Sequence, residues 1–237
     1  MPEQVGRVRA LHAFPVKSTA GQSLSQAEVG RRGLSGDREW AVYTSDGGIA
    51  SGKTTRRFRR VPGLLAWSSS QTAGAPPELR SPEGRVYRVD DPGAGQALSS
   101  SLGQPLQLRR ETDVLHHDEC PVHVVTTASL RRVEQSVGAV LDASRLRANI
   151  LLETEGADFV EDAWADAELS IGPQVVLRLG SGMPRCLMID QPQAGVFAAP
   201  PVLQVLGREH DVRLGLQAEV LRGGTIALGH EALLTRC

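Results

Sequence analysis

The sequence predicts a mainly β protein with a few short helices, and two observations support this fold class. The 237 residues include 25 glycines and 14 prolines spread along the chain, a distribution typical of many short elements joined by turns. Between the turns lie runs rich in branched residues, which favour strands: VRALHAF, EWAVYT, RVYRV, VHVVTT, NILLE, QVVLRL and TIAL. Many strands with few helices indicate a β-barrel-like or sandwich architecture.

Only two segments have the periodicity of a helix. Residues 128–140 read ASLRRVEQSVGAV, and their apolar residues recur at a helical spacing on one face: Leu130, Val133, Val137 and Val140. Residues 200–208, PPVLQVLGR, begin with a proline that suits the first turn of a helix. We therefore expect one helix in each of these segments.

Composition divides the chain in two. Residues 71–105 are rich in Pro, Gly and Ser and close a first half, and the charged segment ETDVLHHDEC leads into a second half. We place the boundary near residues 108–118, which gives domains at 1–112 and 113–237. A chain of 237 residues is long enough to bury a core in two small domains or in one large domain.

The composition argues against several classes of partner. A net charge of −1 provides no electrostatic reason to expect nucleic acid. The chain has no apolar run of the roughly 18 residues that a membrane span needs, and the first residues lack the apolar core of a signal peptide. Three cysteines, Cys120, Cys186 and Cys237, are a sparse and odd set that favours a reducing compartment. We expect a cytoplasmic protein that binds neither nucleic acid nor a membrane.

Cys186 lies in GMPRCLMID, directly after Arg185. A neighbouring guanidinium favours the thiolate form of a cysteine, and a thiolate attacks electrophiles or binds soft metals. The alternative is a cysteine that packs in the core as a small hydrophobic residue.

Further polar residues lie where strands give way to turns or to a helix. Lys17 and Ser18 follow a Pro-Val pair, and Arg38 stands in GDREW. Arginine binds phosphate oxygens in a bidentate way and lysine supplies a point charge. The alternatives are an ordinary turn at Lys17 and Ser18, and a solvated ion pair of Arg38 with a neighbouring carboxylate.

Three hydroxyl residues, Thr126, Thr127 and Ser129, lie where a predicted strand passes into a predicted helix. Free backbone amides and hydroxyls at such a junction attract anions. The alternative for Ser129 is a helix cap.

Two motifs suggest other chemistry that their context argues against. Residues 47–54, GGIASGKT, match a phosphate-binding loop, but Ser-Asp-Gly-Gly at 45–48 favours a hairpin, so we do not expect nucleotide hydrolysis. Lys53 in this motif is a further candidate for the border of the site. Residues 116–120, HHDEC, with His123, have some zinc-ligand types but no clear second pair, and we expect a solvated loop there.

Several motifs stand in an order that resembles the MOSC proteins, named for the C-terminal domain of molybdenum-cofactor sulfurases. They are LHAFPVKSTAG, VGRRGLSGDREWAVY, PVHVVTTASL, RLRANILLETEGADFVEDAWADAELSIG, RCLMID and GGTIALG. The resemblance covers nearly the whole chain. It is strongest to the branch that places a barrel-like domain before the MOSC domain and includes the mitochondrial amidoxime-reducing components.

The resemblance implies a set of binding residues. Cys186 would be the protein ligand to molybdenum, and the cofactor would be held by Lys17, Ser18, Arg38, Thr126, Thr127, Ser129, Arg147, Asn149 and Arg185. Arg147 and Asn149 stand in RLRAN and match an R-x-N motif of the family. Pyridoxal phosphate binding is a further property that the family resemblance implies.

The function implied is a molybdenum-cofactor reductase of small N-hydroxylated or N-oxide compounds. The chain has no four-cysteine iron–sulfur signature and no dinucleotide fingerprint, so electrons would come from a separate donor, a ferredoxin or a flavoprotein reductase. Two alternatives stay open: a sulfur carrier with a persulfide on Cys186, and a non-catalytic cofactor-binding protein. The second alternative rests on departures from the family pattern at Met183, Pro184 and Gln217.

Overall fold

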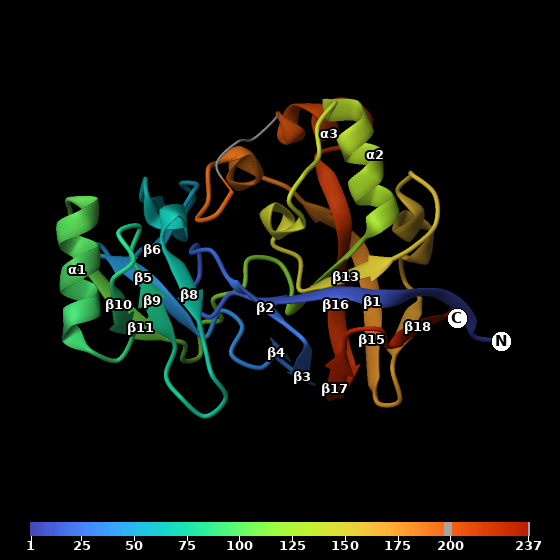
Figure 1. The fold of residues 1–237 in the computed structure, drawn as a ribbon, viewed down its shortest axis with the longest axis horizontal. Helices are drawn as coiled ribbons and strands as arrows, with labels where there is room; N and C mark the ends of the chain where they lie inside the picture. The colour runs from blue at the N-terminus through green and yellow to red at the C-terminus, as the bar shows by residue number, and fades with distance from the viewer. Residues whose placement is uncertain (197–200, 237) are drawn as a thin grey trace.

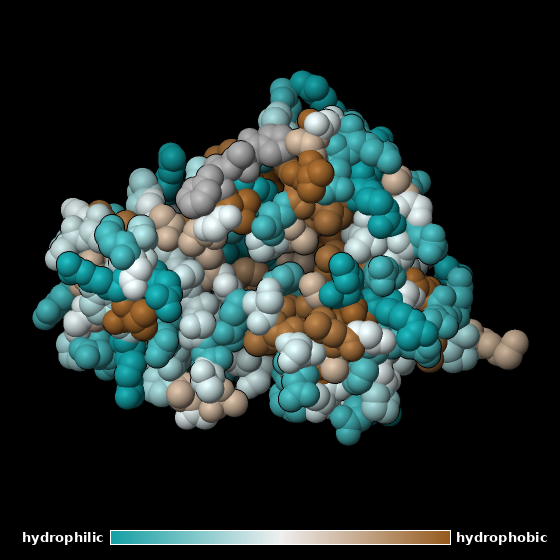
Figure 2. Space-filling model, in the orientation of Figure 1, coloured by the Kyte–Doolittle hydropathy of each residue, from teal (hydrophilic) through white to brown (hydrophobic). Residues whose placement is uncertain are grey.

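A computed structural model describes residues 1–196 and 201–236 as two lobes joined side by side (Figure 1). Strands dominate both lobes, which confirms the mainly β fold class. Each of the seven runs predicted as strands contains or overlaps one. The face shown in Figure 2 is mostly hydrophilic and is hollowed between the two lobes.

The larger lobe is a closed β-barrel. Its sheet has the order β13-β12-β16-β15-β14-β18-β1-β2, and β1 also pairs with β13, so seven of the eight strands form a ring. Inward-facing branched residues such as Leu11, Val124, Ile150 and Leu177 fill the interior. The strands are β1 (Glu3–Ala13), β2 (Gln22–Leu24), β12 (Val122–Thr126), β13 (Ile150–Glu153), β14 (Glu168–Ile171), β15 (Val175–Pro184), β16 (Arg213–Arg222) and β18 (Glu231–Thr235).

The smaller lobe packs around Trp67 and Leu98. It contains a four-stranded sheet, β11-β5-β6-β7, and a three-stranded sheet, β10-β9-β8, while a third sheet, β17-β3-β4, lies beside the barrel (Figure 1). Their bounds are β3 (Gln26–Gly30), β4 (Gly33–Leu34), β5 (Trp40–Thr44), β6 (Ile49–Ser51), β7 (Phe58–Arg60), β8 (Ser68–Ser70), β9 (Glu78–Arg80), β10 (Val86–Arg88), β11 (Leu106–Arg110) and β17 (Gly224–Ala227).

Both predicted helices are confirmed, with different ends. Helix α2 spans Thr127–Val137 and ends at Gly138, whose φ of 70° is left-handed, so the chain leaves the helix before Val140. Helix α3 spans Val202–Glu209; residue 200 of the predicted segment lies outside the described residues. Four 3₁₀ turns complete the helical elements: η1 (Leu64–Ala66), η2 (Ala143–Leu146), η3 (Val160–Trp164) and η4 (Leu187–Asp190).

A third helix, α1 (Pro92–Leu102), corrects the expectation of only two helical segments. Its sequence, PGAGQALSSSL, has poor intrinsic helix propensity. The helix forms because Asp91 caps it through Gly93 N, Pro92 suits its first turn, and Ala94 and Leu98 are buried against the smaller lobe. Tertiary burial therefore outweighs propensity here.

The barrel sheet contains strands from both halves of the sequence. β1 and β2 lie before residue 112, yet β1 pairs with β13 and β18 across the predicted boundary. The division at residues 112 and 113 stays a prediction. Because β1 is a strand of the barrel, the chain that leaves β1 enters the smaller lobe directly beside the barrel. No described helix is long and apolar enough to cross a membrane.

Candidate functional site

A cavity lies where the two lobes meet, and it brings together most of the residues predicted for the site. Seven of them line it: Lys17, Ser18, Arg38, Arg147, Asn149, Arg185 and Cys186. Lys53, the candidate from the loop-like motif, lines it as well. These residues come from segments up to 169 positions apart, so the cavity exists only because the lobes pack against each other.

The segment after β1 presents Lys17 and Ser18. The amide of Lys17 donates to the carbonyl of Trp40 at 2.8 Å, and the hydroxyl of Thr19 donates to the carbonyl of Val16 at 2.8 Å. These bonds form a tight turn in which Ser18 has a φ of 66°. The turn directs the almost fully buried Lys17 side chain into the cavity.

Three cavity residues have a left-handed backbone, which is uncommon for residues other than glycine. Ser18, Arg38 and Arg147 have φ values of 66°, 55° and 53°, and they make up half of the six described non-glycine residues with positive φ. Such conformations cost free energy and concentrate at functional sites. The backbone therefore marks this cavity independently of its side chains.

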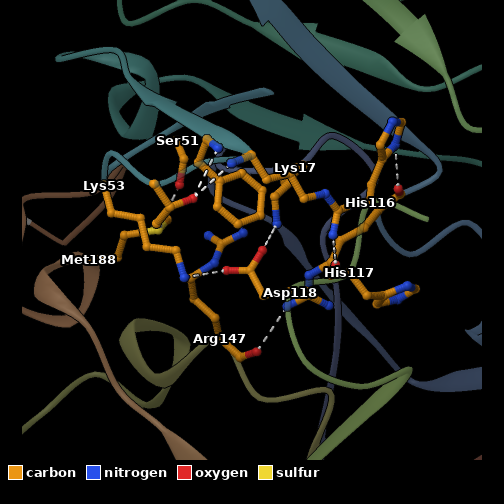
Figure 3. A network of polar contacts seen from close by, with 12 residues as sticks. Lys17, Ser51, Lys53, His116, His117, Asp118, Arg147 and Met188 are labelled. Atoms are coloured by element: carbon orange, nitrogen blue, oxygen red, sulfur yellow. Dashed lines mark hydrogen bonds and ion pairs between the residues drawn. The ribbon is translucent and has the colours of Figure 1, made fainter. Parts of the chain in front are cut away.

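A pair of lysines holds one carboxylate inside the cavity. Lys17 and Lys53 approach Asp118 from two sides (Figure 3): Lys17 donates a short hydrogen bond to Oδ1, and Lys53 Nζ lies 3.0 Å from Oδ2. Burial lowers the pKa of Lys17 to about 8 even though Asp118 opposes this shift. Burial also disfavours the ionised form of Asp118, but the two lysines outweigh it and hold its pKa below the usual range.

Two arginines stack on one aromatic ring beside the lysines. The guanidinium carbons of Arg147 and Arg38 lie 4.2 and 4.8 Å from the ring centre of Phe14. Arg147 Nη1 donates to the carbonyl of Thr19 at 2.7 Å, and Arg38 forms an ion pair with the buried Asp37. Burial, reinforced by the neighbouring Arg38, lowers the pKa of Arg147 to about 9, so it stays charged at neutral pH.

The segment that carries Cys186 leaves the barrel at the end of β15. The amide of Arg185 donates to the carbonyl of Val212 at 2.8 Å, and Arg185 Nη2 donates to the carbonyl of Leu146 at 2.7 Å. Cys186 follows as the residue before η4 and is a free, half-buried thiol at the cavity. Its position at a polar cavity does not match the alternative of a core cysteine.

Asn149 lines the cavity, but its side chain holds the barrel together. Its Oδ1 accepts from the amide of His123 at 3.1 Å, and its Nδ2 donates to the carbonyl of His12 at 3.3 Å. These bonds join β1, β12 and the start of β13. Asn149 therefore stabilises the part of the barrel wall next to Arg147.

The structure does not bring Thr126, Thr127 and Ser129 to the cavity. The hydroxyls of Thr126 and Ser129 donate to Glu161 Oε2 at 2.7 and 2.6 Å, and Thr127 Oγ1 donates to the carbonyl of Thr154. Thr126 also caps α2 through the amide of Ser129. These hydroxyls are occupied at the start of α2, because the loop that contains Glu161 folds over them.

The expectation of a solvated loop at HHDEC holds for Asp118 and Glu119, which are exposed, but it is wrong for the two histidines. His116 and His117 are buried, and His117, Asp118, Glu119 and Cys120 line the cavity. His116 bonds to the hydroxyl of Tyr43 at 3.0 Å and to the carbonyl of Arg38 at 3.1 Å, so the loop is anchored in the smaller lobe. The only signal available in the sequence was the dense run of titratable residues directly before a strand.

Residues 47–54, whose sequence matches a phosphate-binding loop, begin in the turn of a hairpin, as expected. The amide of Thr44 donates to the carbonyl of Gly48 at 2.9 Å and closes the turn, after which the chain continues into β6. A phosphate loop would lead from a strand into a helix. Here β6 leads instead to Lys53, whose side chain reaches Asp118 in the cavity (Figure 3).

The donor set suits an anion that carries a soft metal. Five cationic residues line the cavity against two carboxylates, Asp118 and Glu119. Arg185 Nε is buried without a hydrogen-bond partner among the described residues, an expensive arrangement unless a ligand accepts from it. The Cys186 sulfur is a soft ligand type that suits such a metal. These residues therefore fit a phosphate-bearing, thiolate-ligated metal cofactor.

The fold and this cavity define a MOSC-family protein. The family description "MOSC domain" matches residues 111–232, and "MOSC N-terminal beta barrel domain" matches residues 5–115. The chain belongs to this family, which confirms the predicted resemblance.

Curated relatives and a solved structure agree with this assignment. The chain is 27% identical to mitochondrial amidoxime-reducing component 1 of Danio rerio, over 86% of this chain and 74% of that protein. It is 26% identical to the Homo sapiens protein of the same name, over 86% of this chain and 72% of that one. The crystal structure of the YUAD protein from Bacillus subtilis matches 99% of this chain and 98% of its own, with a TM-score of 0.54 and 12% identity. This last likeness shows the fold alone.

Proposed function

We propose that this protein is a molybdenum-cofactor-dependent reductase of small N-hydroxylated or N-oxide compounds. The observation that carries the proposal is the placement of the Cys186 thiol in a cavity with buried cations and an unpaired Arg185 donor. Membership of the MOSC family and the amidoxime-reducing relatives support the same reaction class. The sparse cysteines of the chain suit a reducing location such as the cytoplasm.

Each group of cavity residues has a distinct part in binding. Cys186 would supply the protein ligand to molybdenum, and Lys17, Lys53, Arg38 and Arg147 would bind the phosphate and the pterin edge. When bound, the cofactor supplies two-electron redox chemistry at the metal. Overall, an N–OH group would take up two electrons and two protons, the N–O bond would break, and the products would be an N–H group and water.

The protein contributes charge and orientation to this reaction. Lys17 Nζ keeps its proton at neutral pH, because its pKa of about 8 lies above 7. Arg38 and Arg147 are held on Phe14, so their charges point in fixed directions without reorganisation on binding. Electrons would arrive from a separate ferredoxin or flavoprotein reductase.

A sulfur carrier is the second candidate, and one observation favours it. A second thiol, Cys120, lines the same cavity as Cys186, so a persulfide on one cysteine would have a neighbour able to receive or release sulfur. Burial raises the pKa of Cys120, which disfavours its thiolate form.

Metal analysis and mass spectrometry distinguish the two candidates. Protein from a host that makes the cofactor should contain molybdenum near one atom per chain and should reduce benzamidoxime with reduced methyl viologen. Cys186→Ser should lose the turnover but keep most of the pterin, because a hydroxyl is a harder, poorly ionised ligand. Molybdenum far below stoichiometric with no turnover would refute the reductase, and a labile sulfur on Cys186 after incubation with a cysteine desulfurase would favour the carrier.

A further inference from the structure

A second hollow lies on the other side of the HHDEC loop, and we name it the arginine groove. Arg31, Arg32 and Arg57 line it together with Leu115 and residues 117–121, which include the carboxylates of Asp118 and Glu119. Residues 117–120 also line the cofactor cavity, so one loop forms the wall between the two hollows. A partner in the groove would be separated from the cavity by this loop alone.

The positive charge of the groove continues into the neighbouring segment 53–60. That segment, KTTRRFRR, has five Lys or Arg residues and no acidic residue, although the whole chain has a net charge of −1. Arg32 pairs with Glu111, and Arg57 donates to the carbonyl of His117 at 2.9 Å. Arg31 and Arg56 are exposed and form no ion pair within the described part of the chain. This leaves fixed positive charge that the fold itself does not use.

Exposed apolar residues accompany this charge. Val114 and Leu115 are 56% and 49% exposed, although both are large hydrophobic residues, and Leu115 lines the groove. Protein interfaces combine apolar contact with arginine, which is enriched in them. A small anion would use the arginines but would leave these two side chains in water, whereas a protein partner would cover both.

We infer that the arginine groove is the docking surface for an acidic one-electron carrier protein. The inference rests on the proposed reductase function, which requires an external electron donor. Complementary charge steers such carriers to their partners and speeds association. Redox encounters also bury little surface, so a small groove with a charged rim is sufficient. The carrier would deliver electrons singly, two for each N–OH group reduced, across the wall of residues 117–120.

A charge-reversal pair tests this surface. The groove pair is Arg31→Glu, in the lining of the groove, with Arg56→Glu, next to the groove residue Arg57; it reverses two exposed charges that lie outside the cofactor cavity. The matched control is Arg9→Glu with Arg208→Glu, two exposed arginines outside the groove, which changes the net charge by the same amount. The probe is a plant-type [2Fe–2S] ferredoxin of net negative charge. We would measure its binding by thermophoresis to the loaded and the cofactor-free protein, and its support of benzamidoxime reduction, at low and high salt.

The groove pair should weaken ferredoxin binding and kcat/KM for ferredoxin by about tenfold or more at low salt, and should flatten the salt dependence. The control pair should change both by less than about twofold, and turnover with methyl viologen should be the same in all three proteins. Equal losses in both pairs, or no loss in the groove pair, would overturn the inference.

Other outcomes are equally decisive. A wild-type protein that turns over with methyl viologen but neither binds ferredoxin nor accepts its electrons does not dock an acidic carrier at this groove. A single-stranded oligonucleotide that binds more tightly than ferredoxin and is released by the groove pair would reassign the surface to nucleic acid. Loss of viologen-driven turnover in the wild type refutes the reductase instead, and ferredoxin binding to the cofactor-free protein still tests the groove.

Discussion

Two buried polar clusters in this protein use similar residue types in different ways. The cavity cluster consists of Lys17, Arg38, Arg147, Arg185 and Cys186, and it lies open to a hollow between the lobes. The hydroxyl cluster consists of Thr126, Ser129 and Glu161, and it is closed under the loop of η3 beside α2. The two clusters differ in charge and in access to solvent.

Burial disfavours the ionised carboxyl at both clusters, but the net pKa shifts differ in direction. In the hydroxyl cluster no cation of the described residues pairs with the carboxyl, so burial raises the pKa of Glu161 although two hydroxyls oppose the shift. Cations predominate in the cavity cluster, and Asp37 behind it stays ionised, because Arg38 and His117 outweigh the burial of its carboxyl and lower its pKa to about 2. A buried cluster with an excess of cations and an open side can bind an anion, whereas the closed hydroxyl cluster holds the fold together.

The largest effect should come from Arg38→Ala, which tests the charge of the cavity cluster. The change leaves Asp37 buried without its ion partner, a loss that typically costs about 3–5 kcal/mol. Pterin content should fall as well. Urea unfolding and pterin analysis measure the two losses.

Lys53→Ala is the matched variant, because Lys53 is less buried and Asp118 keeps Lys17 as a partner. It should reduce pterin content with little change in the free energy of unfolding. Equal stability of the Arg38 and Lys53 variants would contradict the buried ion pair.

Glu161→Ala tests the hydroxyl cluster and should destabilise the fold without affecting the cofactor. Two buried hydroxyls would lose their acceptor, with an expected cost of about 2–4 kcal/mol. Glu161→Gln keeps an acceptor oxygen and should cost less. Pterin content per folded molecule should match the wild type in both variants, and a fall would show that the hydroxyl cluster reaches the cofactor.

The pH dependence of Lys17 sharpens the comparison further. Its folded pKa of about 8 lies below the ordinary lysine value of 10.5, so between these values the unfolded chain binds more protons and the free energy of unfolding increases with rising pH. The free energy of unfolding of the wild type should therefore rise relative to that of Lys17→Met from pH 8 to pH 10. Cofactor affinity of the wild type should fall over the same range, because the lysine loses its charge. Parallel pH profiles of the two proteins would contradict the shift.

Thr127→Val should have the smallest effect. The hydroxyl accepts from the amide of Thr154 at 3.0 Å and donates to the carbonyl of the same residue at 3.2 Å. Its loss should cost about 1 kcal/mol in thermal unfolding and leave pterin content unchanged. A loss of pterin without a loss of stability would show that Thr127 contacts the cofactor.

Sequence reasoning worked where the information was local. Runs of branched residues predicted the strands, apolar periodicity predicted α2, and the Ser-Asp-Gly-Gly turn predicted the hairpin before Lys53. It failed at α1, whose glycines and serines form a helix only because Asp91 caps it and Leu98 is buried. It also missed the burial of His116 and His117 in HHDEC, because His116 is held by distant contacts with Tyr43 and Arg38.

Amino-acid types and motifs alone determined the mainly β class, the family and the set of cationic residues beside Cys186. Tertiary structure alone decided which polar residues share a cavity, because Lys17, Asp118, Arg147 and Cys186 meet only when β1 closes the barrel beside the smaller lobe. It likewise directed Thr126 and Ser129 to Glu161, a residue more than 30 positions away. Burial and hydrogen-bond partners depend on contacts between distant segments, and no local pattern encodes them.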